Sequence, residues 1–197
     1  MNTSKLKARE LITTAIFTVV FMIVTFACVM VTSITVFTYP LLASASGLLC
    51  GIIWLYMRLR VPKRFTVLLQ SVICALLFFV VGAGWFVALG ILIGGIFAEV
   101  ITSLGKYKSF KLTAIAYAVY GFCFHWGSFL VVIISREYYI EYAVANGTNR
   151  QLIDTLLPMM SWQFLLIGSI LCIVFSVIGM LLGKTLLKKH FVKAGMV

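Results

Sequence analysis

Charged residues are scarce in this 197-residue sequence: they make up 11% of it, and only five residues are acidic. A soluble domain carries about a quarter charged residues, so this composition excludes one. Hydrophobic residues account for 63%, and the mean hydropathy is +1.14. The basic residues occur in short clusters between apolar runs of bilayer-spanning length, so the net charge of +11 does not indicate binding to nucleic acid. The sequence therefore predicts an integral membrane protein.

Motifs for hydrolytic, metal or nucleotide chemistry are also lacking. The sequence contains no G-x-S-x-G, no H-E-x-x-H, no phosphate loop and no C-x-x-C. All five cysteines lie within apolar runs, at spacings that suit neither a metal site nor a disulfide framework, and we interpret them as small hydrophobic residues. We therefore expect no catalytic residue, no cofactor and no metal site. Any active process would need a partner that hydrolyses ATP.

Six apolar runs predict an all-α bundle of six transmembrane helices, forming one domain over residues 1–197. With the first basic cluster in the cytoplasm, every basic residue except Arg136 and Arg150 falls on that side, so both termini are predicted to be cytoplasmic. Lys5, Lys7 and Arg9 precede a run that has no small-residue cleavage site, and we expect this segment to be retained. The predicted spans are residues 11–37, 39–57, 65–81, 85–104, 112–135 and 161–187.

The connection over residues 136–160 is much longer than the other outer connections. It mixes aromatic and acidic side chains, as an interfacial helix or a cap would, and it contains an Asn146-Gly147-Thr148 turn. A loop of this length in a small protein is usually functional or disordered, and its aromatic content favours order. We interpret it as a lid over an outward-facing site.

One apolar run carries a carboxylate well inside it. Gly90, Gly94 and Ala98 recur every four residues and are followed by Glu99. Small residues at this spacing predict close packing against another helix. A charge inside a bilayer costs about 2.5 kcal/mol or more, so Glu99 needs a partner, and we expect packing or helix-end hydrogen bonding rather than substrate contact. Gly105 is expected to close this helix in a left-handed conformation.

Side chains suited to ligand binding gather in the outer half of the predicted bundle. Aromatic walls with few polar groups are typical of a small-molecule pocket, although tryptophan and tyrosine also populate the membrane interface. A histidine inside the bilayer normally has a partner or a ligand. The aromatic, methionine and single-histidine character would suit a porphyrin or a ring-containing vitamin. The candidate substrate-binding residues are Tyr39, Trp85, His125, Trp126, Ser128, Tyr138, Tyr139, Met159 and Trp162.

Two stretches of the sequence resemble a known family. The basic opening Lys5-Leu6-Lys7-Ala8-Arg9-Glu10-Leu11-Ile12, and Gly94-Gly95-Ile96-Phe97-Ala98-Glu99 leading to Gly105-Lys106-Tyr107-Lys108-Ser109, are similar to the Trep_Strep group of membrane proteins. That group resembles the substrate-binding S components of energy-coupling factor (ECF) transporters. The resemblance implies a six-helix bundle in the bacterial cell membrane that binds a micronutrient from outside. Such a subunit docks onto a transmembrane T component and two cytoplasmic ATPases, and topples in the membrane to release its cargo.

The same resemblance implies a docking motif and a ligand class. The first helix of the family carries an alanine-x-x-x-alanine motif, and the nearest matches here are Ala15 with Val19 and Thr14 with Thr18. The cobalt and nickel members use an N-terminal histidine, where this sequence has Asn2, so import of a metal ion is disfavoured. Two other functions stay open: an enzyme acting on lipid or prenyl substrates, and a non-transporting scaffold. The enzyme would require Glu99 and His125 to converge across an axial gap of about 10 Å.

Overall fold

The computed structural model describes residues 6–35 and 38–188, so Asn2, Lys5 and the end of the chain from residue 189 lie outside the described residues. Within the described residues, every regular element is a helix. The long helices are α1 (Ala8–Thr32), α2 (Leu42–Arg60), α3 (Thr66–Val80), α4 (Trp85–Leu104), α5 (Phe110–Ile134) and α8 (Trp162–Leu186). The short ones are η1 (Tyr39–Leu41), α6 (Arg136–Ala145), α7 (Arg150–Leu156) and η2 (Leu157–Met159).

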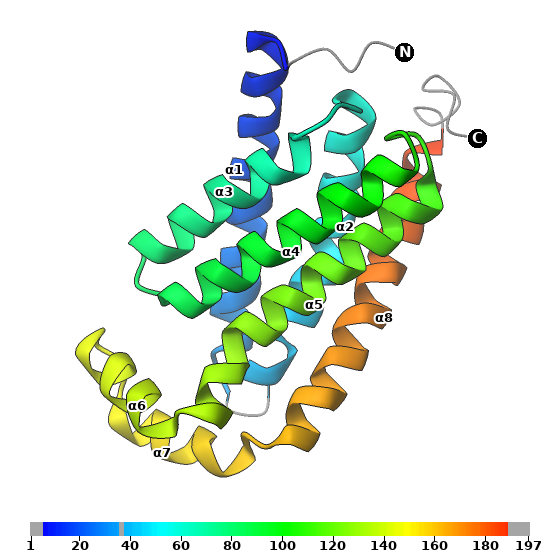
Figure 1. Cartoon of the computed structure of the whole chain (residues 1–197). Coiled ribbons are helices and arrows are strands. Elements are labelled where there is room, and N and C mark those ends of the chain that lie inside the picture. Colours follow the sequence, from blue (N-terminus) through cyan, green and yellow to red (C-terminus); the bar gives the residue numbers. More distant parts are fainter. Residues whose placement is uncertain (1–5, 36–37, 189–197) are drawn as a thin grey trace.

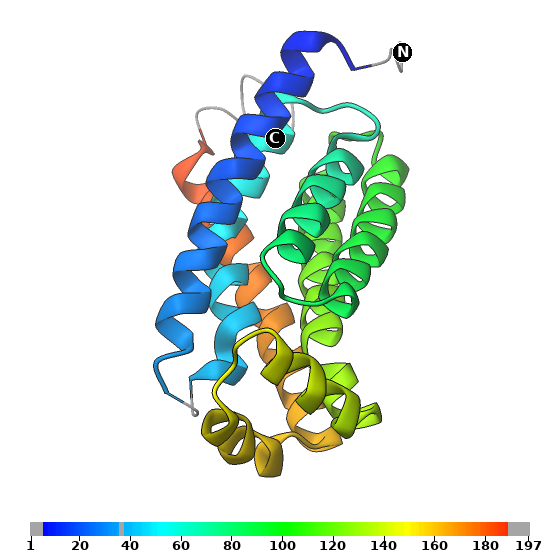
Figure 2. The ribbon, with the colours of Figure 1, turned by 90° about the vertical axis from the view of Figure 1, so that its left-hand side faces the viewer.

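The long helices form one bundle that is capped at one end by α6 and α7 (Figure 1). Helix α4 packs between α3 and α5, and α2 packs between α1 and α8. We call the capped end the lid end; the turned view in Figure 2 shows α6 and α7 lying across it. The opposite end, which we call the basic end, holds the start of α1, the α2–α3 and α4–α5 connections and the end of α8 (Figure 1). These four segments carry the basic clusters of the sequence.

Five of the long helices are long and apolar enough to cross a membrane. The exception is α3, which is apolar but has only 15 residues. The structure therefore shows five candidate spans, and the sixth stays a prediction. Helix α1 ends at Thr32, earlier than the predicted limit at residue 37, and the hydroxyl group of Thr38 donates a hydrogen bond to the free carbonyl of Thr32 at 2.8 Å.

Small residues bring helix backbones into contact. A Cβ atom at Gly90 would lie 2.6 Å from the carbonyl oxygen of Cys123 on α5, and one at Gly51 would lie 2.6 Å from the carbonyl carbon of Gly179 on α8. Gly94 also faces Cys123, and Ala98 is fully buried. The ridge of Gly90, Gly94 and Ala98 thus lies within the bundle, where close backbone approach permits extensive dispersion contact.

The carboxylate of Glu99 lies at the start of α3. It accepts hydrogen bonds from the backbone N–H groups of Phe65, Val67 and Leu68, at 2.7, 3.2 and 3.4 Å. The first N–H groups of a helix lack partners within it, and the helix dipole favours a negative charge there. Glu99 is therefore hydrogen-bonded at a helix end, which provides the partner that a carboxylate needs inside an apolar segment.

The expectation for Gly105 is wrong. Its φ is −87°, and the chain turns instead through left-handed conformations at Lys106 and Tyr107, with φ values of 48° and 62°. The reason is a tertiary contact: the buried ring of Tyr107 lies under the guanidinium group of Arg58, 5.3 Å from its central carbon. Such a contact offsets the roughly 1 kcal/mol or more that a non-glycine residue costs in this region.

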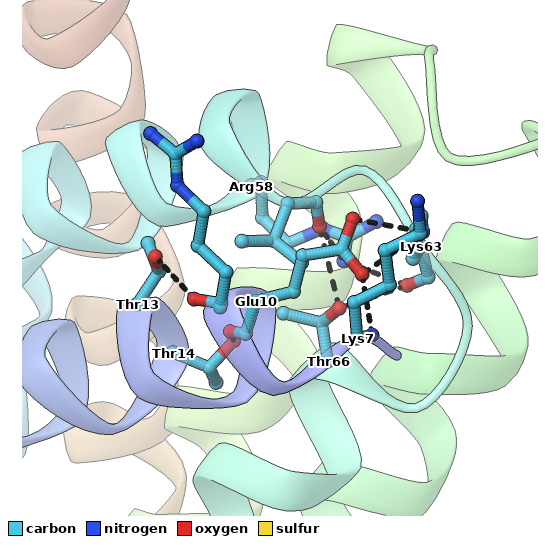
Figure 3. A network of polar contacts seen from close by, with 9 residues as sticks. Lys7, Glu10, Thr13, Thr14, Arg58, Lys63 and Thr66 are labelled. Atoms are coloured by element: carbon cyan, nitrogen blue, oxygen red, sulfur yellow. Dashed lines mark hydrogen bonds and ion pairs between the residues drawn. The ribbon is translucent and has the colours of Figure 1, made fainter. Parts of the chain in front are cut away.

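A second polar contact at the basic end joins α1 to the α2–α3 connection (Figure 3). The Lys63 ammonium group forms an ion pair with Glu10 at 2.8 Å, and Glu10 also accepts a hydrogen bond from the backbone N–H of Lys7 at 2.8 Å. The hydroxyl group of Thr66 donates to the carbonyl of Lys63 at 3.0 Å. The starts of α1 and α3 are thereby held together beside Arg58.

Candidate functional site

A cavity of about 440 Å³ lies at the lid end of the bundle. It is lined by parts of α1, η1, α2, α3, α4 and α5, and α6 contributes Tyr139, Tyr142 and Ala143. Rings of Phe26, Phe78 and Phe124 pack against one another along one wall, with centroids 5.2 and 5.4 Å apart. The volume falls within the range of about 300 to 1,000 Å³ that is usual for small-molecule sites.

The polar groups of the cavity are all neutral. Charged side chains and histidine are absent from the lining residues that the structure describes. Burial raises the pKa of the Tyr139 phenol, and a hydrogen bond with Tyr39 offsets this effect only in part, so Tyr139 stays protonated near neutral pH. The cavity can therefore donate and accept hydrogen bonds without offering a counter-charge. Its polar residues are Ser33, Tyr39, Ser128, Tyr139, Tyr142, Asn146 and Thr148.

Hydrogen bonds attach the roof of the cavity to α4 and the turn before it. The indole N–H of Trp85 donates to the hydroxyl group of Tyr138 at 2.7 Å, and the hydroxyl group of Tyr142 donates to the carbonyl of Gly82 at 3.4 Å. At the first residue of α6, the guanidinium group of Arg136 donates to the carbonyl of Met160 at 3.3 Å. The segment 136–160 thus forms a folded cap over the cavity.

A second hollow, of about 680 Å³, lies on the outer surface of the bundle between α4 and α5. It is an open groove whose lining is almost entirely apolar, and we call it the α4–α5 groove. Trp85, Trp126 and Tyr138 line it, and the indole N–H of Trp126 is bonded to the hydroxyl group of Ser169 at 2.8 Å. These three predicted residues therefore face the groove rather than the cavity.

A family model described as hypothetical bacterial integral membrane protein, Trep_Strep, matches residues 8–193. The chain belongs to this family. None of the curated proteins and none of the solved structures matches it. This Trep_Strep protein is accordingly a multi-pass bacterial integral membrane protein, as its long apolar helices also indicate.

The candidate residues on α5 of this Trep_Strep protein lie on three different faces of the helix. Ser128 lines the cavity, Trp126 lines the groove, and His125 points at α8. The His125 ring is fully buried; its Nε2 atom lies 3.3 Å from the carbonyl oxygen of Leu165, and Gly168 leaves the space that the ring occupies. His125 thus packs between two helices and does not line the cavity, contrary to the prediction. Glu99 contacts α3, so the convergence that an enzyme would require is not formed.

Of the nine predicted substrate-binding residues, the structure brings together Tyr39, Ser128 and Tyr139 around the cavity. Met159 and the exposed Trp162 line neither hollow, because both lie where η2 leads into α8, beyond the roof. The prediction missed Phe86, Tyr142, Asn146 and Thr148. Tyr142 could have been found from helical spacing, since it lies one turn after Tyr138 and Tyr139.

Two of the predicted docking residues are unavailable. Thr14 and Thr18 are fully buried in the bundle, and their hydroxyl groups donate to the carbonyls of Glu10 and Thr14 at 2.9 and 2.8 Å. These bonds satisfy the hydroxyl groups within α1, so this ridge packs inward instead of facing a partner. Ala15 is half-buried and Val19 is exposed, so the other predicted pair lies at the surface.

Proposed function

We propose that this protein is the S component of an ECF-type importer, which captures a small micronutrient outside the cell and releases it inside. The observation that carries the proposal is the capped, uncharged cavity at the end of the bundle opposite the basic clusters. Basic residues concentrate on the cytoplasmic side of membrane proteins, which would leave the lid end and its cavity facing outward and both chain termini inside.

The partners that follow are a transmembrane T component and two cytoplasmic ATPases. The sequence has no phosphate loop, so energy for release would come from those subunits. The resemblance to S components and the membership of the Trep_Strep family support this arrangement.

The chemistry of the cavity limits the class of ligand that it could bind. Its aromatic walls, hydroxyl groups and one amide suit a neutral, ring-containing compound such as a vitamin. A porphyrin fits less well. Its carboxylates would meet no cation among the described lining residues, and His125 and Met159, the side-chain types that ligate haem iron, lie outside the cavity.

The test is to purify the protein from its host with bound small molecules retained, and to identify them by mass spectrometry. Ser128→Trp places a large side chain in the cavity and should abolish the retained compound. Ser103→Trp is the matched control: Ser103 is near the basic end of α4, where its hydroxyl group bonds only to the carbonyl of Val100 at 2.7 Å. It should leave the bound compound unchanged.

The same purification reports the partners. A T component and ATPases should be recovered with the tagged protein. Recovery of equal amounts of the small molecule from Ser128→Trp would refute the cavity as the binding site. Catalytic turnover of a lipid by the isolated chain would refute the transport role.

A further inference from the structure

The α4–α5 groove opens toward the lipid. On α4, the groove-lining side chains of Trp85, Leu89, Ile93 and Phe97 follow one another every four residues and are each between 40% and 53% exposed. They extend over about 18 Å of helix from the lid end. Because α4 and α5 are both long and apolar enough to span a membrane, these side chains face the acyl chains of the bilayer.

Only side chains separate the groove from the cavity. The ring of Phe86 lines both hollows, whereas Trp85 and Tyr138 line the groove and Tyr142 lines the cavity. The Phe86 ring packs edge-on against Trp85 and Tyr142, with centroids 5.9 and 5.5 Å apart. The rings of Tyr138 and Tyr142 are 6.2 Å apart. We call these four rings the aromatic wall.

Beside the aromatic wall, the backbones of α4 and α5 are in direct contact. One turn along α4, a Cβ atom at Gly127 would lie 2.9 Å from the Cα atom of Gly90, so the two helices touch there and leave no passage. Nearer the lid end, the Phe86 side chain fills the separation, and the Trp85 to Tyr138 hydrogen bond closes the outer side. Rotation of these side chains would join the two hollows without a movement of the helices.

We propose that the aromatic wall is a lateral gate through which an uncharged, lipid-soluble ligand passes from the bilayer into the cavity. This inference rests on the proposed function and adds to it the class of substrate and its route. The described linings of groove and cavity are both free of charge and both contain aromatic rings, so an uncharged ring system finds ring contacts in the groove and in the cavity. An ionic ligand would lose its hydration without compensation.

The test uses the full-length protein in liposomes, with Cys123 of the groove changed to Ala and with Ser128→Cys as the reporter in the cavity. Two maleimides are compared: N-pyrenylmaleimide, which is neutral and dissolves in the bilayer, and a sulfonated maleimide, which stays in water. Methyl methanethiosulfonate, a small neutral reagent, verifies in each variant that the thiol reacts. We expect the pyrenyl reagent to modify the reporter several times faster than the sulfonated one.

Gate variants then identify the route. Phe86→Ala should raise the rate of pyrenylmaleimide labelling about tenfold, because it removes both edge-on ring contacts, and Phe86→Trp should lower it. Trp85→Phe keeps a ring but removes the hydrogen-bond donor, so it should also raise the labelling rate. This variant replaces Phe86→Ala as the test if Phe86→Ala does not fold. Phe79→Ala and Phe79→Trp are matched controls on α3, where Phe79 is 57% exposed and lines neither hollow; they should have no effect.

Two results would overturn the gate. If the sulfonated reagent labels the reporter as fast as the pyrenyl reagent, the cavity fills from water under the lid, and the proposed function stands without the lateral route. If all variants of Phe86 and Trp85 label at the parental rate, the wall does not control entry. Failure of both maleimides to reach a reactive reporter would contradict the gate and the accessible cavity together, and with them the proposed function.

Discussion

At the scale of single residues, Glu99 shows how a charge is accommodated in an apolar segment. Its carboxylate takes up three backbone N–H groups at the start of α3 that would otherwise lack partners. Hydrogen bonds to an ionised acceptor are stronger than those between neutral groups. One residue of α4 thus provides the cap that the residues preceding α3 do not supply themselves.

We expect Glu99→Gln to lower the free energy of unfolding by about 1.5 to 3 kcal/mol, because the amide keeps the shape of the side chain but loses the charge and one acceptor. The measurement is denaturant-induced unfolding in detergent micelles. Glu137→Gln on the exposed surface of α6 is the control and should leave the unfolding free energy unchanged. Equal stability of the two variants would show that the cap contributes nothing.

The sequence predicted the region of the candidate site better than it predicted the individual residues that line the cavity. Three of the predicted residues, Tyr39, Ser128 and Tyr139, line the cavity, whereas His125 and Trp126, three and two residues before Ser128, face other surfaces of α5. In a helix of a soluble protein, the polar face shows which side of the helix points to solvent. On a membrane helix every face is apolar, so the sequence shows which turn a residue occupies but not the direction in which it points.

At the scale of elements, helix α1 presents two surfaces, about 100° apart around the helix, that differ in burial. Thr14 and Thr18 face the bundle and bond to their own helix, while Val19 is 51% exposed. The surface of α1 that remains for the proposed T component is therefore the one bearing the predicted docking residues Ala15 and Val19. Small side chains there permit close approach of another helix.

If α1 docks through this surface, Val19→Trp should reduce the amount of T component and ATPases recovered with the tagged protein, because the larger side chain holds the helices apart. Val31→Trp on the same helix is the control. Val31 is 64% exposed but lies near the lid end, away from the expected interface, and its substitution should not change the recovery. Equal recovery from both variants would exclude Val19 from the interface.

The positions of the helices could be predicted from the sequence where they depend on residues close together in the chain. Apolar runs and basic clusters predicted where the long helices lie, and the aromatic content of residues 136–160 predicted an ordered segment where α6 and α7 now stand. The start of α3 depends on Glu99, more than thirty residues later, and the turn at Lys106 and Tyr107 depends on Arg58. Such contacts between distant segments have no local signature.

At the scale of the whole molecule, the two ends of the bundle differ in charge, and only the lid end is covered by α6 and α7. The basic clusters gather at one end, and the capped cavity lies at the other (Figure 1). The proposed transport role would need that asymmetry, because a ligand would enter on one side and the energising subunits would bind on the other.

Cysteine labelling in intact cells tests the orientation. Glu141→Cys on the exposed surface of α6 should react with a membrane-impermeant maleimide, because the lid end is expected outside, and Lys108→Cys at the basic end should react only after the cells are opened. Both changed residues are exposed, so accessibility in the folded protein is matched. The reverse pattern would place the cavity toward the cytoplasm.

The 15-residue length of α3 has a consequence for the surrounding lipid. Such a helix rises only about 22 Å, against a hydrocarbon layer of about 30 Å. If α3 crosses the membrane as predicted, the bilayer beside it has to thin or the whole bundle has to incline, at a cost of a fraction of a kcal/mol for each ångström of mismatch. A sixth span of this length would strain the membrane more on the α3 flank than on the other flanks, and a thinner bilayer would reduce that strain.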